Sequence, residues 1–356
     1  MKKVLATLLS VILVLSASVT VFGATQKDVK EKTASAASFV DESYKADGYS
    51  VTSNLKVFYI LVKSGYDVSA YEDDFLASVK STLDSNGFTS VDNLGPVINI
   101  LIDLGLDPTN FEGYNLANIL TGIPASNCYN AYNLVYAIEA AKALGLNDYA
   151  NDLAAALLDY YEAGVGTHFW RAYGSDYDTT SADDLAMFII GLSYVDNENY
   201  DVYLSDAFSL LQTYYTEQGY SNYGANADST ALALGAFSVA GNKEKADSVY
   251  KLLMDNFYNS ENGAYKVPDG YDEGYAASDA LYGLALYAPL ADEDPVPPIN
   301  NDDKKDNKNN GNTKAEEKKN TSKKSPATSN SASLAGGLTA LSLSALAIIA
   351  LKKKEN

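Results

Sequence analysis

Segments that carry almost no charge recur along the chain, and each is rich in small and apolar residues. Residues 231–240, for example, combine alanine, leucine, phenylalanine and valine with one glycine and one serine. A helix that is apolar on nearly every face has to be buried on all sides. We therefore predict six inner helices, at residues 55–62, 93–104, 131–144, 184–194, 229–240 and 278–287.

Amphipathic segments alternate with these uncharged ones. Their apolar residues recur at i, i+3 and i+4 and their charges lie on the opposite face, which is the pattern of a helix covered on one side only. The clearest examples are residues 71–83, 149–162, 203–215 and 245–257. They predict an outer layer of helices around the inner one.

The positions at which the inner segments begin are evenly spaced. They are Asn54, Asp92, Tyr132, Asp183, Asp228 and Asp279, and consecutive positions lie 38 to 51 residues apart. That spacing is the length of two helices and two loops, and such a period indicates a repeat architecture. We predict an all-α fold, an (α/α)6 toroid of six inner and six outer helices. No useful stretch alternates with period two, so we expect no sheet.

Glycine follows four of the predicted inner helices, at Gly65, Gly105, Gly145 and Gly241. A glycine just beyond a helix typically adopts the left-handed conformation that ends it. Parallel inner helices would then open all their N-termini at one rim, together with the loops that enter them.

Three turns carry a resemblance to a known superfamily. They are Asn86-Gly87-Phe88, Gln218-Gly219-Tyr220 and Asn262-Gly263-Ala264-Tyr265. These turns are similar to the Gln/Gly/Trp turn of the terpenoid cyclase and protein prenyltransferase repeat, and the resemblance covers most of residues 27–290. It implies a toroid of six helix pairs, and says more about the fold than about a reaction.

Both ends of the chain differ from its middle. Lys2 and Lys3 precede an apolar run, and small or branched residues then lead up to Ala24. This pattern is typical of a secretory signal peptide at residues 1–23. Residues 24–294 would form the toroid domain, and the polar, proline-containing and lysine-rich stretch 295–324 a disordered linker.

The last segment, residues 325–356, resembles the cell-wall sorting signal of Gram-positive surface proteins. An apolar run near 334–351 and three terminal lysines follow a short motif, in which Pro326 and Thr328 match the family's Leu-Pro-x-Thr-Gly while Ser325 and Ser329 replace its leucine and glycine. The resemblance implies a sortase-like transpeptidase as a partner and attachment to the cell wall. The alternative is a simple transmembrane anchor. Either reading places the toroid outside the cell.

Charge excludes one class of partner. Between Ala24 and Asn300 there are 13 basic and 40 acidic residues, a net charge of −27. Such a surface repels phosphate backbones, so we expect no nucleic-acid binding. Cys128 is the only cysteine, so no intramolecular disulfide can form and packing alone must hold the fold together.

Acidic residues at the predicted helix starts are the first candidates for chemistry. Two facing carboxylates, from among Asp183, Asp228 and Asp279, would suit acid–base cleavage of a glycosidic bond. The alternative is that these residues, like Asp92 and Asp184, only cap helix N-termini.

The predicted rim is also the best place to look for a bound ligand. His168, Trp170 and Arg171 bring the only His, Trp and Arg of the chain into one loop, and tyrosines gather in the last two loops, at Tyr220, Tyr223, Tyr265, Tyr271 and Tyr275. Aromatic faces stack on sugars or other flat ligands, and Arg binds carboxylates. A structural role for Trp170 and Arg171 is the alternative.

Metal and cofactor chemistry has little support in the sequence. Cys128 and His168 lack the further ligands of a zinc site, and Asp176, Asp178 and Asp183 do not have EF-hand spacing. We expect neither metal nor cofactor.

The sequence therefore favours a non-catalytic surface protein that binds a glycan, a peptide or a small hydrophobic ligand at its rim. The alternatives are a carbohydrate-active hydrolase or lyase, and a degenerate terpene cyclase-like enzyme. The last of these would need a deep apolar cavity.

Overall fold

The fold is described from a computed structural model, which covers residues 23–46, 48, 52, 54–128, 131–164, 167–170, 180–221, 224–267 and 273–294. Helices dominate these ranges. The outer ones are α2 (Gln26–Ala46), α4 (Ser69–Ser85), α6 (Leu116–Gly122), α8 (Asn147–Leu158), α10 (Asp201–Thr213) and α12 (Lys243–Asn256). The inner ones are α3 (Leu55–Lys63), α5 (Val91–Asp103), α7 (Ala131–Ala143), α9 (Ala182–Ser193), α11 (Ala227–Val239) and α13 (Glu273–Tyr287).

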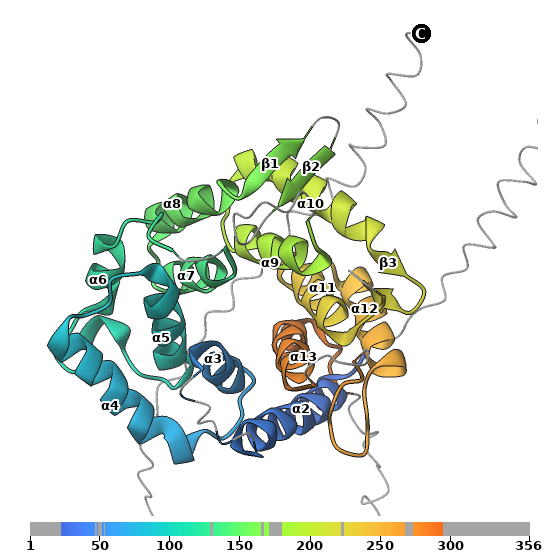
Figure 1. Cartoon of the computed structure of the whole chain (residues 1–356), viewed down its shortest axis with the longest axis horizontal. Coiled ribbons are helices and arrows are strands. Elements are labelled where there is room, and N and C mark those ends of the chain that lie inside the picture. Colours follow the sequence, from blue (N-terminus) through green and yellow to red (C-terminus); the bar gives the residue numbers. More distant parts are fainter. Residues whose placement is uncertain are drawn as a thin grey trace, which may run out of the picture. The chain divides into compact units, whose positions relative to one another are not determined.

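The inner helices form a closed ring (Figure 1). Each one contacts the next along the chain, and α13 returns to contact α3. The outer helices lie outside this ring, with α2 beside α13. The (α/α)6 toroid predicted from the sequence, with six inner and six outer helices in the described ranges, is therefore confirmed.

Burial follows the predicted division into two layers. Every residue of α11 from Ser229 to Ser238 is buried, whereas α10 buries only Ala207 and Leu211. An uncharged helix needs neighbours on all sides, and the ring supplies them. The inner helices thus form most of the hydrophobic core.

The four predicted C-terminal glycines all have positive φ, between 72° and 77°. After α3, the N–H of Gly65 donates to the carbonyl of Val62, and the N–H of Tyr66 donates to that of Leu61. The same pair of bonds follows α5, α7 and α11. This is the Schellman arrangement, which satisfies the last carbonyls of a helix and turns the chain outward.

The ends of the described chain close the ring. Thr25 forms a β-bridge with Asp292, and the N–H of Gln26 donates to the Asp292 carbonyl at 2.8 Å. Farther along α2, the hydroxyl of Tyr250 on α12 donates to Asp28 at 2.6 Å. The first and last helix pairs are therefore joined by hydrogen bonds as well as by packing.

The expectation of no sheet is wrong in detail. Two short antiparallel hairpins occur in the loops that enter the inner ring: β1 (Tyr161–Gly164) with β2 (Thr167–Trp170), and β3 (Tyr215–Thr216) with β4 (Gly219–Tyr220). Strands of two to four residues are too short to show a period-two pattern. They also end α8 and α10 earlier than the amphipathic pattern predicts.

In the part of the chain that the structure describes, no helix has the length and hydropathy needed to cross a bilayer. The predicted signal peptide apart from Gly23, the predicted linker, and the predicted sorting and anchor segments all lie outside the described residues. These predictions stay predictions.

Candidate functional site

The N-terminus of α9 brings two adjacent carboxylates to one rim of the ring. Ser181 caps this helix, accepting from the N–H of Asp184 at 3.0 Å, while Asp184 accepts from the N–H of Ser181 at 3.2 Å. The hydroxyl of Tyr132 on α7 donates to the other oxygen of Asp184 at 2.8 Å. The capping interpretation is therefore confirmed for Asp184, which closes a reciprocal capping box.

Asp183, the neighbouring residue, is in a different environment. It lies next to Ser229 of α11. Burial raises the pKa of Asp183 to about 6, the negative charges of Asp279 and Asp184 add to this, and Ser229 and Lys56 act in the opposite direction. A carboxyl group with this pKa keeps its proton in mildly acidic solution, which an ordinary aspartate does not.

Asp279 supplies a second carboxyl group from a different helix. It is the seventh residue of α13 rather than a helix start, so the prediction that it caps a helix is wrong: α13 begins at Glu273, a turn and a half before the sequence pattern suggested. The ammonium of Lys56 on α3 lies 2.8 Å from Asp279 Oδ1, and 14% of the Asp279 side chain is exposed. Asp279 is thus fixed at the rim by its ion pair with Lys56.

Lys56 was missed by the sequence reasoning, although a signal was present. It is the only charged residue in the predicted inner segment 55–62. A lone ammonium in an otherwise uncharged inner helix needs an acidic partner from a neighbouring helix. The structure identifies that partner as Asp279.

Tyr275 lies one helical turn before Asp279, on the same face of α13. It is 55% exposed, which is unusual for a large aromatic side chain in this protein. An exposed aromatic face beside a carboxylate offers a flat surface on which a sugar ring can stack. The structure therefore places this predicted ligand-binding residue near the Asp183–Asp279 group.

Asp228 and Asp92 occupy equivalent places at the starts of α11 and α5. Asp228 is the second residue of α11, whose N-cap is Asn226. Asp92 is only 2% exposed and accepts a hydrogen bond from the thiol of Cys128 at 2.7 Å. Among the residues that the structure describes, no three His, Cys, Asp or Glu side chains come together as a metal site.

Two of the predicted ligand-binding tyrosines are buried, which corrects the prediction of an aromatic rim. Tyr220 is 1% exposed and Tyr265 is fully buried. Tyr220 packs between Tyr215 and the buried Phe237, and Tyr265 packs against Tyr258. Because burying an aromatic ring stabilises the fold, these two rings hold their turns against the core.

The other predicted loop residues are only partly visible. The backbone of β2 contains His168, paired with Ala163, and Trp170, paired with Tyr161. The side chains of these strands, and Arg171, Tyr223 and Tyr271 altogether, lie outside the described residues. Their role in ligand binding stays a prediction.

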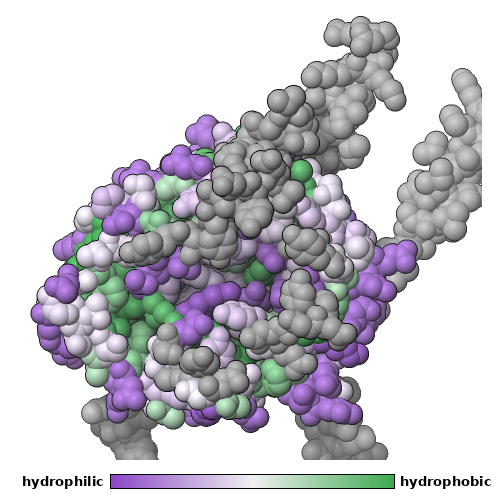
Figure 2. Space-filling model, in the orientation of Figure 1, coloured by the Kyte–Doolittle hydropathy of each residue, from purple (hydrophilic) through white to green (hydrophobic). Residues whose placement is uncertain are grey.

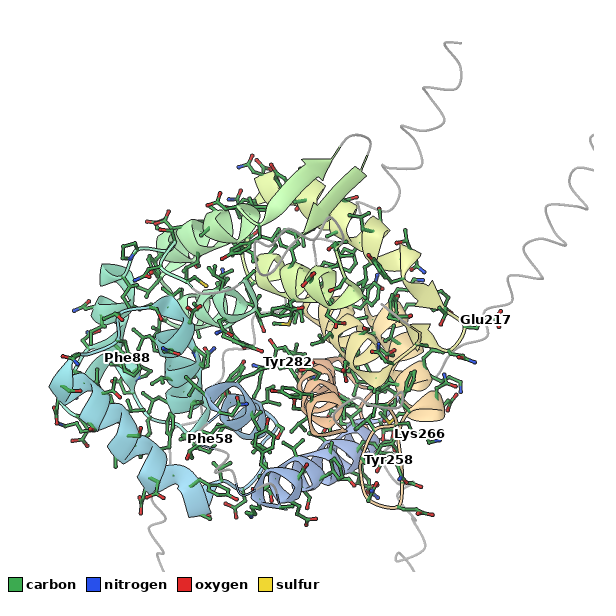
Figure 3. The ribbon with its side chains drawn as sticks, in the orientation of Figure 1. Phe58, Phe88, Glu217, Tyr258, Lys266 and Tyr282 are labelled. Atoms are coloured by element: carbon green, nitrogen blue, oxygen red, sulfur yellow. The ribbon has the colours of Figure 1, made fainter. Side chains whose placement is uncertain are left out.

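Three tyrosine rings pack together inside the inner ring of helices. Tyr59, Tyr136 and Tyr282 come from α3, α7 and α13, and their ring centroids are 5.1 to 6.3 Å apart. Tyr282 points toward the centre of the ring in Figure 3. The terpene cyclase-like alternative would need a deep apolar cavity at this level, where these three side chains pack instead.

A polar cluster lies next to these tyrosines, near the C-terminal ends of the inner helices. Glu139 accepts from the hydroxyl of Tyr59 and from the ammonium of Lys63, the latter at 2.5 Å. Only 12% of the Glu139 side chain and 19% of the Lys63 side chain are exposed. Figure 2 shows one face of the ring, hollowed at its middle, with hydrophilic residues lining part of the hollow.

Replacing Glu139 with alanine is expected to lower the free energy of unfolding by about 3 kcal/mol, because it leaves a largely buried ammonium without its counter-charge. Chemical denaturation measures this. Adding Lys63→Met to the variant should restore much of the loss. If the double variant is no more stable than Glu139→Ala alone, the ion pair is not the cause.

The fold and its rim define the class of protein: an (α/α)6 toroid with paired carboxyl groups at the N-terminal ends of its inner helices. No family model matches the chain, and no curated protein matches it significantly. Solved structures with a similar fold include a family 88 glycosyl hydrolase from Bacteroides vulgatus, with 11% sequence identity, a TM-score of 0.45, and coverage of 75% of this chain and 99% of that one.

Two further solved structures are similar in the same way. A polysaccharide lyase shares 12% identity at a TM-score of 0.43, covering 72% of this chain and 98% of its own. A family 105 glycoside hydrolase from C. acetobutylicum shares 14% identity at a TM-score of 0.44, covering 71% of this chain and 98% of its own. At such low identity, the function of this chain has to follow from its own residues.

Proposed function

We propose that the N-terminal rim of the inner ring is the active site of a glycoside hydrolase, in which Asp183 is the general acid. The observation that carries this proposal is the pairing of two carboxyl groups in opposite environments. Asp183 is half-buried beside Ser229, where desolvation raises its pKa, whereas Asp279 is fixed by the ammonium of Lys56. Two carboxyl groups whose environments differ in this way are typical of acid–base catalysis. The proposal favours the carbohydrate-active alternative over a non-catalytic binder.

Each carboxyl group has a separate role in this mechanism. Protonated Asp183 donates its proton to the glycosidic oxygen as the bond between that oxygen and the anomeric carbon breaks. Asp279, paired with Lys56, either takes a proton from the attacking water or bonds to the anomeric carbon itself. The leaving sugar departs with the proton of Asp183. In the first route the hydroxyl of water bonds to the anomeric carbon, its proton goes to Asp279, and proton exchange with solvent returns a proton to Asp183; in the second, the hydroxyl of water displaces Asp279 from the anomeric carbon and the proton of water goes to Asp183.

The charge of the rim narrows the class of substrate. Asp92, Asp183, Asp184, Asp228 and Asp279 lie near the N-terminal ends of the inner helices. Among the described residues the cation beside them is Lys56, which is already paired, and Arg171 lies outside the described residues. Elimination from a uronic acid would need cations to hold the sugar carboxylate and stabilise its developing charge. The described rim instead suits hydrolysis of a neutral or amino-sugar glycan, with Tyr275 as a stacking surface.

An assay of the full chain on three classes of glycan tests this function. The classes are neutral glucans and mannans, amino-sugar polymers, and uronate polymers, and the readout is the release of reducing ends over time. We expect release from a neutral or amino-sugar polymer. Unsaturated products from a uronate polymer would instead show a lyase, and binding without cleavage in all classes would favour the non-catalytic alternative.

Surface display completes the proposal. The patterns at residues 1–23 and 325–356 support export and attachment at the outside of a Gram-positive cell, with Thr328 as the site of transpeptidation. An extracellular polymer too large to enter the cell would then be within reach of the rim. Mass analysis of cell-wall fragments that carry the chain tests whether Thr328 is the linked residue.

A further inference from the structure

The seam between the first and last helices contains an unbalanced group of charges. The ammonium of Lys243, on α12, lies 2.8 Å from Asp247 Oδ2 and 3.2 Å from Asp292 Oδ1. Only 8% of the Asp247 side chain is exposed, against 44% for Asp292. Two carboxylates therefore share one cation, and one negative charge is left over in a partly buried place.

The backbone at Gly23 and Ala24 lies directly against this group. A Cβ atom built on Gly23 would be 2.7 Å from Lys243 Nζ and 2.8 Å from Asp247 Oδ2. The carbonyl of Ala24 accepts from the N–H of Asp292 at 2.9 Å. Any positive charge that appeared on the backbone here would be next to both carboxylates.

Tyr287 fixes where the nitrogen of Ala24 lies. Its hydroxyl donates to Asp247 Oδ1 at 2.6 Å and faces the backbone N–H of Ala24. Burial and the bond to Asp247 raise the pKa of Tyr287, and the Ala24 N–H acts against them. The Ala24 nitrogen is thus connected to Asp247 through a single shared hydroxyl.

We propose that the chain is processed between Gly23 and Ala24, and that the α-ammonium of Ala24 is the missing cation of this seam. A peptidase that cleaves after small residues would add water to the bond: the hydroxyl goes to the carbonyl carbon of Gly23 and the proton to the nitrogen of Ala24. At neutral pH the new amine gains a second proton and becomes charged.

Processing and ring closure are coupled in this scheme. In the uncleaved chain the Ala24 nitrogen is a neutral amide, and Asp247 and Asp292 have only Lys243 between them. In the cleaved chain two cations, Lys243 and the α-ammonium of Ala24, face two carboxylates, Asp247 and Asp292, and the Tyr287 hydroxyl lies among them. The hydrogen-bonded pair of Tyr250 and Asp28 is the next polar group along the seam. Export therefore yields a ring whose joint is more stable than that of the precursor.

The experiment uses the full chain secreted from a Gram-positive host. Mass spectrometry of the secreted protein is expected to identify Ala24 as its first residue. Nitrogen-15 NMR of the α-amine should then give a pKa at least one unit above its ordinary value of about 8. A first residue elsewhere, or an amine with an ordinary pKa, overturns the proposal.

Selective acetylation of the α-amine supplies the stability test. At pH 7 the free-amine form should melt at least about 2 °C higher than the acetylated form. If the pKa of the α-amine is higher in the folded than in the unfolded protein, the charged amine stabilises the fold fully at pH values below the unfolded-state pKa. This stabilisation is lost as the pH rises through the folded-state pKa. The difference in melting temperature between the two forms should therefore vanish in alkaline solution. Equal melting temperatures at pH 7 contradict the proposal.

Two carboxylates of the same helix serve as test and control. Asp247→Asn should remove most of the difference between the free and acetylated forms, whereas Asp255→Asn, at an exposed pair with Lys251, should leave it unchanged. Should Asp247→Asn fail to fold, Asp292→Asn makes the same test at the more exposed partner. An unchanged difference in both Asp247→Asn and Asp292→Asn rules out the assigned contacts.

Discussion

Asp183→Asn is expected to lower kcat on the cleaved glycan by at least about 100-fold, because an amide cannot donate a proton to the glycosidic oxygen. Asparagine has nearly the same shape as aspartate, so substrate binding and KM should change little. Initial rates measured over a range of substrate concentrations separate the two effects. A loss confined to KM would show that Asp183 binds substrate rather than protonating it.

The pH profile gives an independent check on the same residue. With a pKa of about 6 for Asp183, the active form carries the proton, so the rate should fall as the pH rises through about 6. This alkaline limb should be absent from the residual activity of Asp183→Asn. A wild-type profile that stays flat between pH 5 and 8 would contradict the assigned role.

Asp183→Asn should change stability in the opposite direction from activity. Because burial raises the pKa of Asp183 in the folded state, folded protein binds more protons than unfolded protein between pH 4 and 6, and stability falls as the pH rises through that interval. At pH 7 the buried carboxylate is charged, so Asp183→Asn is expected to stabilise the fold by roughly 2 kcal/mol. A structural residue would lose activity and stability together.

Asp73→Asn is the matched control for these measurements. Asp73 is an exposed aspartate on the outer helix α4. This substitution should leave kcat, the pH profile and the melting temperature as they are. If it lowers activity as much as Asp183→Asn does, the loss reflects net charge rather than the rim.

The inner ring was predictable because charged residues are almost absent from the segments that form it. A surface helix normally carries charged or polar residues on its exposed face, because charged side chains are almost never buried without partners. The uncharged run 229–240 has no such face, so it is expected in the interior. The glycines that end the inner helices were equally clear, since an αL residue beyond a helix selects glycine on steric grounds alone. Both signals depend on local chemistry and need no knowledge of which helices meet.

The site was less predictable because it depends on contacts between distant helices. Asp183 and Asp184 are adjacent and look alike in sequence, yet Asp184 closes a capping box whereas Asp183 lies beside Ser229, where desolvation raises its pKa. Likewise, the exposure of Tyr275 and the burial of Tyr265 follow from how each loop packs, which composition does not specify. The sequence indicated that the candidate residues lie at the rim. Which of them cap a helix, are buried or face solvent depends on how the helices and loops pack.

A close backbone contact between α11 and α13 leads to the second large prediction. A Cβ atom on Gly283 of α13 would lie inside contact distance of the Ala231 carbonyl oxygen on α11, and 2.9 Å from its carbonyl carbon. These are backbone atoms of a buried helix, so neither can move without shifting α11. Gly283→Ala is therefore expected to cost about 3 kcal/mol, although alanine is the better helix former.

Two other helical glycines give a graded comparison by chemical denaturation. At Gly235 the nearest atoms are the methyl ends of Leu286 and Ile190, which can rotate away, so Gly235→Ala should cost less than Gly283→Ala. Gly122, at the end of α6, has open space around it, and Gly122→Ala should be neutral or stabilise by up to about 1 kcal/mol. The expected order of cost follows from what each new methyl group meets: backbone atoms at Gly283, the ends of side chains at Gly235, and solvent at Gly122. Equal stabilities for Gly283→Ala and Gly122→Ala would mean that α11 and α13 do not pack at this distance.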